Sequence, residues 1–147
     1  MHYSTEAVRR QDRLLNESEA KQLLKLGEYG VLSMQTIEGE AYGIPVNYAW
    51  DGHSHIYLHC APEGYKLRCI AAKERVSFCV VGNTRVIPDK FTTAYESIVL
   101  SCDAQLVTDD EERMKALELL LDKYSPNDKI VGMQYARQSF SITAVIR

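Results

Sequence analysis

The sequence has 147 residues, of which 46% are hydrophobic, and a formal net charge of −3. This length is close to the commonest size of one domain and is enough to bury a core without metal ions or disulfides. The negative charge argues against a protein that binds the phosphate backbone of nucleic acids, because such domains usually present a basic surface.

The first 15 residues form a polar segment without a sustained apolar period. They contain the only basic cluster, Arg9, Arg10 and Arg13. We expect an N-terminal arm, residues 1–15, rather than a core element. A short helix follows, which Asn16 or Ser18 can cap and Gly27 ends.

Three strands are expected between residues 29 and 61. The first, 29–37, ends in a turn at Gly39, and the second, 41–50, alternates large with small residues, which predicts one packed face. Pro45 lies on the small-residue side and cannot donate to a ladder, so it belongs at a sheet edge or a bulge. An Asp-Gly turn leads to the third strand, 56–61, antiparallel to the second.

A helix is expected to begin at Pro62-Glu63-Gly64, with Lys66 and Lys73 on one face. A β-branched strand, 75–81, follows. Residues 82–93 contain turn residues with little period and predict a long loop, and long loops in compact domains are often functional.

The C-terminal part predicts a long strand, a helix and a final strand. Residues 95–107 alternate as in a half-buried strand and put Ser97 on the face away from the core. Residues 109–124 give the clearest helix pattern, and 140–146 predict a last strand.

This order of elements is typical of an α+β fold with an antiparallel sheet. About six strands in a domain of this size close most economically into a small barrel, because closure removes exposed edges. No repeat, low-complexity tract or linker divides residues 1–147, so we expect one domain.

The four cysteines are scattered and form no pair with a two-residue gap: Cys60, Cys69, Cys79 and Cys102. Such pairs are typical of zinc and redox sites, so we expect reduced thiols and no metal. The N-terminus has no apolar signal sequence, and no apolar run approaches the ~20 residues of a membrane span. We therefore expect a soluble, cytoplasmic protein.

Residues 44–67 combine strand backbone, a histidine and a lysine beside a helix start. These groups can hold a flat ring at one end and a phosphate at the other, since Lys66 and free helix amides supply charge and donors. The local sequence is also compatible with a solvated Lys66 and with His59 as a structural hydrogen-bonding residue. Cys60 has no visible third group to activate it, which favours a buried thiol over a nucleophile.

A metal site on the third strand is excluded by distance. Four strand steps of ~3.3 Å separate His55 from His59 by ~13 Å, too far for ~2 Å bonds to one ion.

Four segments carry a resemblance to a known family: Tyr-Gly-Val-Leu-Ser, Ile-Pro-Val-Asn-Tyr, Ile-Tyr-Leu-His-Cys-Ala-Pro-Glu-Gly-Tyr-Lys-Leu and Tyr-Glu-Ser-Ile-Val-Leu. In order and spacing they resemble the pyridoxamine 5'-phosphate oxidase-like flavin-binding split-barrel family, and within it the nitroimidazole-resistance-related branch. The resemblance runs from the arm to about Leu121, and the histidine-to-lysine block is its most specific part.

The resemblance implies a homodimer of six-stranded antiparallel split barrels with flanking helices, which binds FMN, or in some members FAD, between the subunits. The implied cofactor-binding residues are Ile44, Pro45, Val46, Asn47, Tyr48, His59, Cys60, Lys66 and Ser97. In this picture residues 44–48 lie along the isoalloxazine, Lys66 faces the phosphate, and Ser97 comes from the partner subunit. His59 is the candidate catalytic side chain.

We therefore predict an FMN-dependent oxidoreductase that passes electrons from NAD(P)H or another reductant to a small planar acceptor, such as a nitroaromatic or a quinone. True pyridoxamine phosphate oxidases carry a C-terminal substrate-binding segment with arginine and histidine. This sequence ends at Arg147, right after the expected last strand, so we expect an activity other than vitamin B6 oxidation.

Three alternatives remain open at this point. The first is a flavin-storage protein without turnover, and the second is a haem-binding split barrel with His59 as axial ligand. The third is a dimeric interaction module with an empty cleft.

Overall fold

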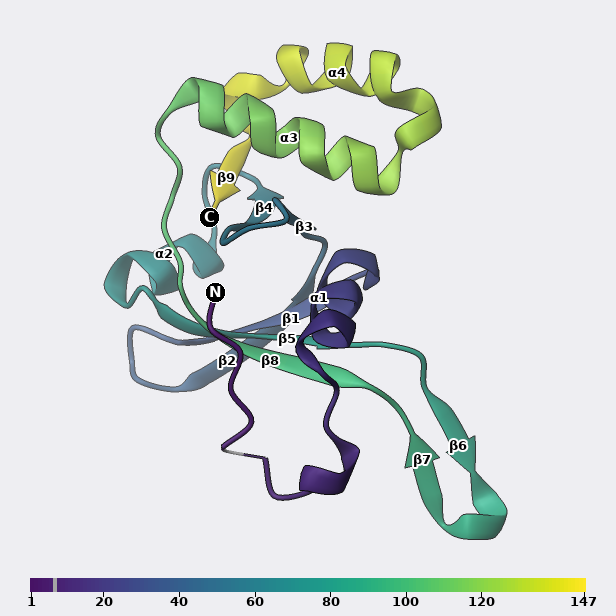
Figure 1. Ribbon diagram of the computed structural model, residues 1–147. Coiled ribbons are helices and arrows are strands. Elements are labelled where there is room, and N and C mark those ends of the chain that lie inside the picture. Colours follow the sequence, from purple (N-terminus) through teal and green to yellow (C-terminus); the bar gives the residue numbers. More distant parts are fainter. Residues whose placement is uncertain (7) are drawn as a thin grey trace.

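The computed structural model describes residues 1–6 and 8–147 (Figure 1). Its described strands form a four-stranded sheet, a three-stranded sheet and a two-stranded ribbon. Every described strand pair is antiparallel. The predicted α+β class with antiparallel sheets is therefore confirmed. The strands pair in separate sheets rather than in one closed ring, so the six-stranded barrel stays a prediction.

The four-stranded sheet has the order β2-β1-β5-β8. Its strands are β1 (Gly30–Gln35), β2 (Ala41–Val46), β5 (Arg75–Val81) and β8 (Ser97–Asp103). Strand β2 lies at one edge and pairs only with β1 among the described strands, where Pro45 is opposite Val31. The predicted edge position of Pro45 is confirmed.

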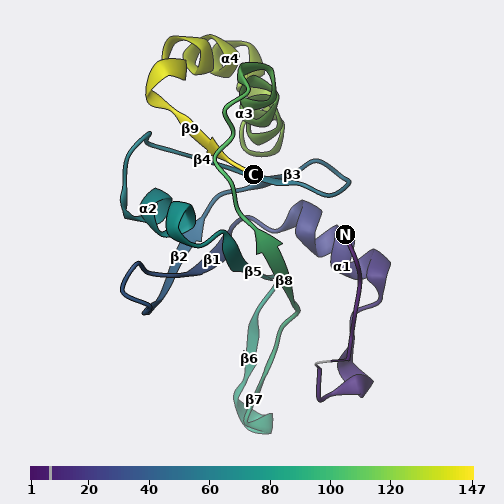
Figure 2. The ribbon, with the colours of Figure 1, turned by 90° about the vertical axis from the view of Figure 1, so that its left-hand side faces the viewer.

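The three-stranded sheet has the order β3-β4-β9 and lies across the core from the larger sheet (Figure 2). Its strands are β3 (Ala49–Trp50), β4 (Ile56–Cys60) and β9 (Ala144–Ile146). Only Asn47 and Tyr48 separate β2 from β3. The single strand expected over 41–50 is thus wrong, because the chain leaves one sheet and enters the other at Tyr48.

The main core lies between the two sheets, α1 (Glu17–Leu26) and α2 (Tyr65–Ala72). Its most deeply buried large side chains include Leu24, Tyr48, Val80 and Ile146. The expected helix start is confirmed, since Asn16 caps α1 by accepting from the Glu19 amide, while the Glu19 carboxylate accepts from the Asn16 amide. This reciprocal pair satisfies two donors at the helix start.

A second cluster joins the smaller sheet to a helical hairpin, α3 (Asp110–Tyr124) and α4 (Lys129–Gln138). Helix α4 was not expected. The last strand is also shorter than expected, because Phe140–Ile142 forms a 3₁₀ turn and β9 begins at Ala144. The Arg113 guanidinium donates to the carbonyls of Phe140 and Thr143, both at 2.8 Å, and holds this turn.

The strand expected over 95–107 also ends early. Strand β8 stops at Asp103, and the next residues cross to the smaller sheet, where the amide and carbonyl of Gln105 bond those of Arg147 at 2.9 Å. The regular ladder of β8 ends here because the chain changes its partner from β5 to the end of β9.

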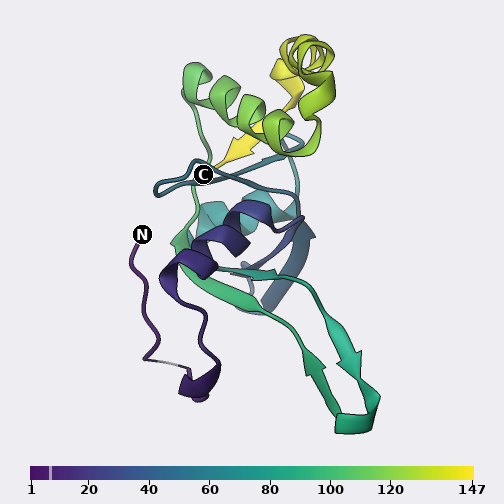
Figure 3. The same ribbon diagram turned by 45° about the vertical axis from the view of Figure 1, so that its right-hand side comes forward.

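Residues 82–93 do not form the expected long loop. Strands β6 (Arg85–Ile87) and β7 (Thr92–Ala94) pair into a ribbon, with a 3₁₀ turn at Pro88–Lys90 between them. Figure 3 shows this ribbon projecting away from the sheets and helices.

The described residues before Asn16 lie outside the core apart from Leu15, which packs against it, and include a 3₁₀ turn at Gln11–Arg13. A further 3₁₀ turn spans Pro126–Asp128. Among the described helices, none has the length and apolar character to cross a membrane.

Candidate functional site

The edge strand β2 presents two different sides. Ile44 and Val46 are half-buried and pack against the main core, whereas Pro45 and Asn47 are exposed. An edge strand keeps one row of backbone groups free of the ladder, and Pro45 contributes only a carbonyl. This strand therefore offers backbone acceptors and the amide side chain of Asn47 to a ligand.

The Tyr48 side chain belongs to the main core and is not exposed beside the strand. Its side chain is fully buried, and its hydroxyl donates to the Leu24 carbonyl at 2.6 Å. The Tyr48 amide donates to the Tyr124 hydroxyl at 3.0 Å, and that hydroxyl donates to the Glu28 carbonyl at 2.6 Å. Tyr48 thus anchors the end of the strand to α1 and α3.

His59, Cys60 and Lys66 lie together where β4 leads into α2. Partial burial lowers the pKa of His59, and the positive charge of Lys66 lowers it further. Burial raises the pKa of the Cys60 thiol, against the opposing charge and hydrogen bond of Lys66. One ammonium group therefore acts on both side chains. The His59 imidazole is neutral and the Cys60 thiol is protonated, and both lie near the positive charge of Lys66.

The start of α2 is open to an anion. Its N-cap is Gly64, with φ +155°, and neither a side-chain cap nor an acidic residue occupies its first turn. Helices α1 and α3 differ, since Asn16 caps α1 and Asp109 caps α3, whereas α4 also begins without a side-chain cap. The first amides of a helix have no intrahelical acceptor, so the free donors of α2 point away from the helix beside Lys66.

Ser97 is not brought to this group within one chain. It lies on β8, at the opposite edge of the sheet from β2. Three strand spacings separate the two edges by about 14 Å. Ser97 and Ser101 do lie on the face away from the core, as predicted, because Ile98, Leu100 and Cys102 pack against the core.

The outer face of the four-stranded sheet is uncharged over two complete rows. One row runs Pro45, Val31, Cys79, Val99, and the next runs Gly43, Ser33, Ser77, Ser101. Val99 is 71% exposed. A broad surface of small and apolar residues is typical of a face that packs against another protein surface.

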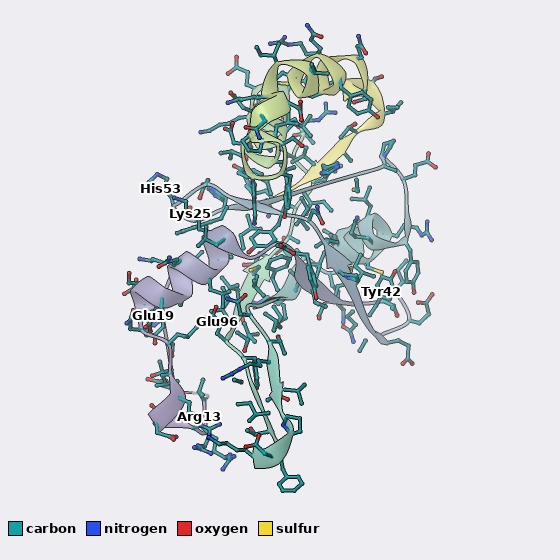
Figure 4. All side chains as sticks on the ribbon, turned by 90° about the vertical axis from the view of Figure 1, so that its right-hand side faces the viewer. Arg13, Glu19, Lys25, Tyr42, His53 and Glu96 are labelled. Carbon is teal, nitrogen blue, oxygen red and sulfur yellow. The ribbon has the colours of Figure 1, made fainter. Side chains whose placement is uncertain are left out.

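Two large hollows are lined mainly by other residues, and the first of them reaches Gly64 at the start of α2. One, of about 1040 Å³, lies between α2 and residues 104–106. The other, of about 660 Å³, lies between α1 and the base of the β6–β7 ribbon, and Glu19 and Glu96 on its two sides are labelled in Figure 4. Neither is lined by His59, Cys60 or Lys66. Neither of these two hollows therefore encloses the three predicted side chains together.

Metal ligands do not gather in the described part of the chain, where no three histidine, cysteine or acidic side chains converge. His55 instead hydrogen-bonds Asp51 at 3.1 Å. The four cysteines are unpaired.

The sequence analysis missed two residues behind the site, Lys123 and Tyr124. The Lys123 ammonium covers the Tyr48 ring, and Tyr124 bridges Tyr48 and Glu28. Both stand at the C-terminal end of α3, where polar residues are normally solvated. Their contacts are 75 or more residues away along the chain, so no local pattern signalled them.

A family model described as pyridoxamine 5'-phosphate oxidase matches residues 16–147. No curated protein is significantly similar to the chain in sequence.

Several solved structures share the fold. A candidate 5-nitroimidazole antibiotic resistance protein from Bacteroides thetaiotaomicron has a TM-score of 0.70 at 16% identity, over 90% of this chain and 78% of that one. A conserved hypothetical protein from Mycobacterium tuberculosis has a TM-score of 0.74 at 17% identity, over 94% and 82%. An FAD- and haem-binding protein from Mycobacterium smegmatis has a TM-score of 0.68 at 14% identity, over 89% and 64%.

Proposed function

Because the chain belongs to the pyridoxamine 5'-phosphate oxidase family, whose model matches residues 16–147, we propose that it binds FMN between two copies of itself. In this proposal the protein is an oxidoreductase, with NADH or NADPH as electron donor. Its acceptor is a small planar molecule such as a nitroaromatic or a quinone. The observation that carries the proposal is the meeting of His59, Cys60 and Lys66 at an uncapped helix start.

The phosphate end of the cofactor is assigned to Lys66 and the first amides of α2. A helix start favours negative charge, and an adjacent ammonium adds a charge-assisted hydrogen bond. The absence of a carboxylate from the first turn supports this assignment, since an acidic side chain there would compete with a phosphate.

The ring end is assigned to the free side of β2 and to the end of β4. The register that pairs Ala49 with Tyr57, if continued, sets Asn47 opposite His59. Pro45, Asn47 and His59 then supply a carbonyl, an amide and an imidazole to the polar edge of the ring. Ile44, Val46 and Tyr48 support this strand from the core side.

A second copy completes the site in this proposal. The uncharged outer rows of the four-stranded sheet provide the face through which two copies pair as a split-barrel homodimer. Ser97 lies too far from β2 to join the site in its own chain, so it belongs to the site of the partner subunit.

The flavin itself supplies the hydride chemistry when bound. The chain's residues bind and orient it: Lys66 neutralises the phosphate, and β2 fixes the plane of the ring. The lowered pKa of His59 leaves the imidazole neutral at pH 7, so that one nitrogen donates and the other accepts a hydrogen bond. His59 can therefore hold a proton beside the ring without adding a charge.

Reconstitution tests this function directly. The purified protein should take up FMN with a fixed stoichiometry, and NADH or NADPH should bleach the flavin absorption, which a nitroaromatic or quinone should restore. Bleaching without reoxidation by any planar acceptor would leave flavin binding but contradict the reductase. Protein that takes up neither FMN nor FAD would contradict the whole proposal.

Haem binding is the second candidate. The neutral His59 imidazole is suited to coordinate iron, and one structural neighbour is named for binding both FAD and haem. A Soret band on addition of haemin, lost in His59→Ala, would support it.

A further inference from the structure

The β6–β7 ribbon and its flanking residues form a projecting arm, residues 83–95. Its base is closed by the Gly82 amide, which donates to the Glu96 carbonyl at 2.9 Å. Figures 1 and 3 show the arm extending well beyond both sheets. Its apolar side chains are left in water: Phe91 is 97% exposed, Val86 66% and Tyr95 64%.

The arm has little to hold it in its own chain. Within the described residues, the one element that β6 packs against extensively is β7, and the reverse is also true. Three residue pairs join them, and a two-stranded hairpin of this size is marginal in water. The arm therefore lacks the packing surface that would order it.

The tip is also strained. Phe91 has φ +50°, the only positive φ at a residue other than glycine in the described chain. A bulky side chain in this conformation is uncommon and persists where surrounding structure compensates for it. In its own protomer the Phe91 amide donates to the Pro88 carbonyl at 3.2 Å, but the side chain is almost fully exposed and has no packing partner there.

The arm continues two strands of the four-stranded sheet whose outer face the proposed function assigns to the dimer. Strands β5 and β8 run straight into it, and Ser97 follows Glu96 at its base. If Ser97 lies at the flavin of the partner subunit, the arm that ends two residues earlier, at Tyr95, lies beside the partner too. The position of Ser97 on the partner therefore determines the position of the arm.

We propose that each arm crosses to the second copy of the chain and sets Phe91 as an apolar wall of that copy's flavin site. This inference rests on the proposed function. The covered region is the exposed side of β2 around Pro45 and Asn47, which has no charge on its outer rows. Each site is then complete only in the dimer, and Phe91 helps to select planar apolar acceptors.

Photo-cross-linking of the full-length protein tests the crossing. p-Benzoylphenylalanine replaces Phe91, and subunits of normal and heavy isotope composition are mixed before illumination. We expect mixed-isotope cross-links from position 91 to residues 43–48 or 56–66. The control carries the probe at Tyr135 of α4, which is 70% exposed and should not cross-link to these residues. Cross-links confined to one chain, or a monomer that forms none, would overturn the inference and point to another partner for the arm.

A substitution separates this inference from the proposed function. Phe91→Ser should leave the fold of each protomer intact, because the side chain buries nothing in its own chain, and should weaken FMN binding about tenfold, with Phe91→Tyr restoring it. Normal flavin binding and turnover in Phe91→Ser would overturn the arm's role and leave the proposed function standing. Cross-links between chains in a protein that binds no flavin would overturn both the proposed function and the flavin contact of the arm.

Discussion

The ammonium nitrogen of Lys123 lies 3.5 Å from the centroid of the Tyr48 ring and has no hydrogen-bond partner in the described structure. The edge of Phe78 meets the same tyrosine ring, with centroids 5.1 Å apart and planes at 77°. Tyr48 is thus enclosed by a cation and an aromatic edge at the point where β2 passes into β3. The C-terminal end of α3 thereby fixes the strand that the proposed function places along the flavin.

Burial lowers the pKa of Lys123 to about 8, from an unfolded value near 10.5. Between these values the unfolded chain binds a proton that the folded chain lacks, so this group makes stability rise with pH. Lys123→Met should therefore be more stable than wild type at pH 7, by on the order of 1 kcal/mol after allowance for water screening and the attraction of the Tyr48 ring. This advantage should shrink towards pH 10.

Urea denaturation of both proteins at pH 7, 8.5 and 10 measures the difference in the free energy of unfolding. The two proteins are compared at each pH because burial raises the pKa of Tyr57 to about 12, and this group titrates alike in both. Its contribution therefore cancels in the difference. Lys115→Met, on the exposed side of the same helix, is the matched control. A Lys123 difference that stays constant with pH would contradict the prediction.

Lys66→Ala should weaken FMN binding much more than riboflavin binding, because only FMN carries the phosphate. A charge-assisted hydrogen bond contributes roughly 1.5–3 kcal/mol, which corresponds to about a 10–100-fold loss for FMN. We expect less than about a threefold change for riboflavin. Titration with quenching of flavin fluorescence measures both affinities.

Lys73→Ala provides the matched control for Lys66. Lys73 lies one heptad further along, at the end of the same helix, where it hydrogen-bonds Gln35. It should leave both affinities near those of wild type. Equal losses of FMN and riboflavin in Lys66→Ala would remove the phosphate assignment.

The electrostatic contact between His59 and Lys66 can be measured without any flavin. Lys66→Met removes the positive charge that lowers the pKa of His59, so this pKa should rise towards its usual value and stop short of it, because burial still lowers it. An NMR titration of the imidazole resonances follows the change. An unaltered His59 titration in Lys66→Met, or an equal shift in Lys73→Met, would show that the two groups do not interact.

Short-range patterns predicted the parts of the fold that depend on neighbouring residues. Asn16 caps its helix, Pro45 occupies a sheet edge, and His59, Cys60 and Lys66 meet because eight residues contain them all. The break between β2 and β3 escaped prediction for the opposite reason. The alternation of large residues continues through Tyr48. The hydrogen bonds that hold Tyr48 where the chain enters the second sheet go to Leu24 and Tyr124, which are 24 and 76 residues away.

Two elements escaped prediction because their apolar residues are exposed. In α4, Ile130 is 79% exposed and Tyr135 70%, which removes the one-sided pattern of a packed helix. In the arm, β-branched residues lie on both sides of Pro88-Asp89, but no buried face accompanies them, and the segment was predicted as a long loop. Burial patterns cannot reveal an element whose apolar side chains are exposed in its own chain.

Gly64→Ala should destabilise the protein and weaken FMN binding together, because Gly64 both turns the chain and opens α2. Its φ of +155° and ψ of 168° lie in a region that is almost confined to glycine, and a Cβ there costs about 1–3 kcal/mol although no atom lies within 4 Å of it. Gly43→Ala is the control, since its Cβ would make only an ordinary 3.5 Å contact with the Ser33 hydroxyl oxygen. Urea denaturation should separate the two variants by at least about 1 kcal/mol. Equal stability would mean that the turn before α2 relaxes freely, and the first amides of this helix would then not be held in place for a phosphate.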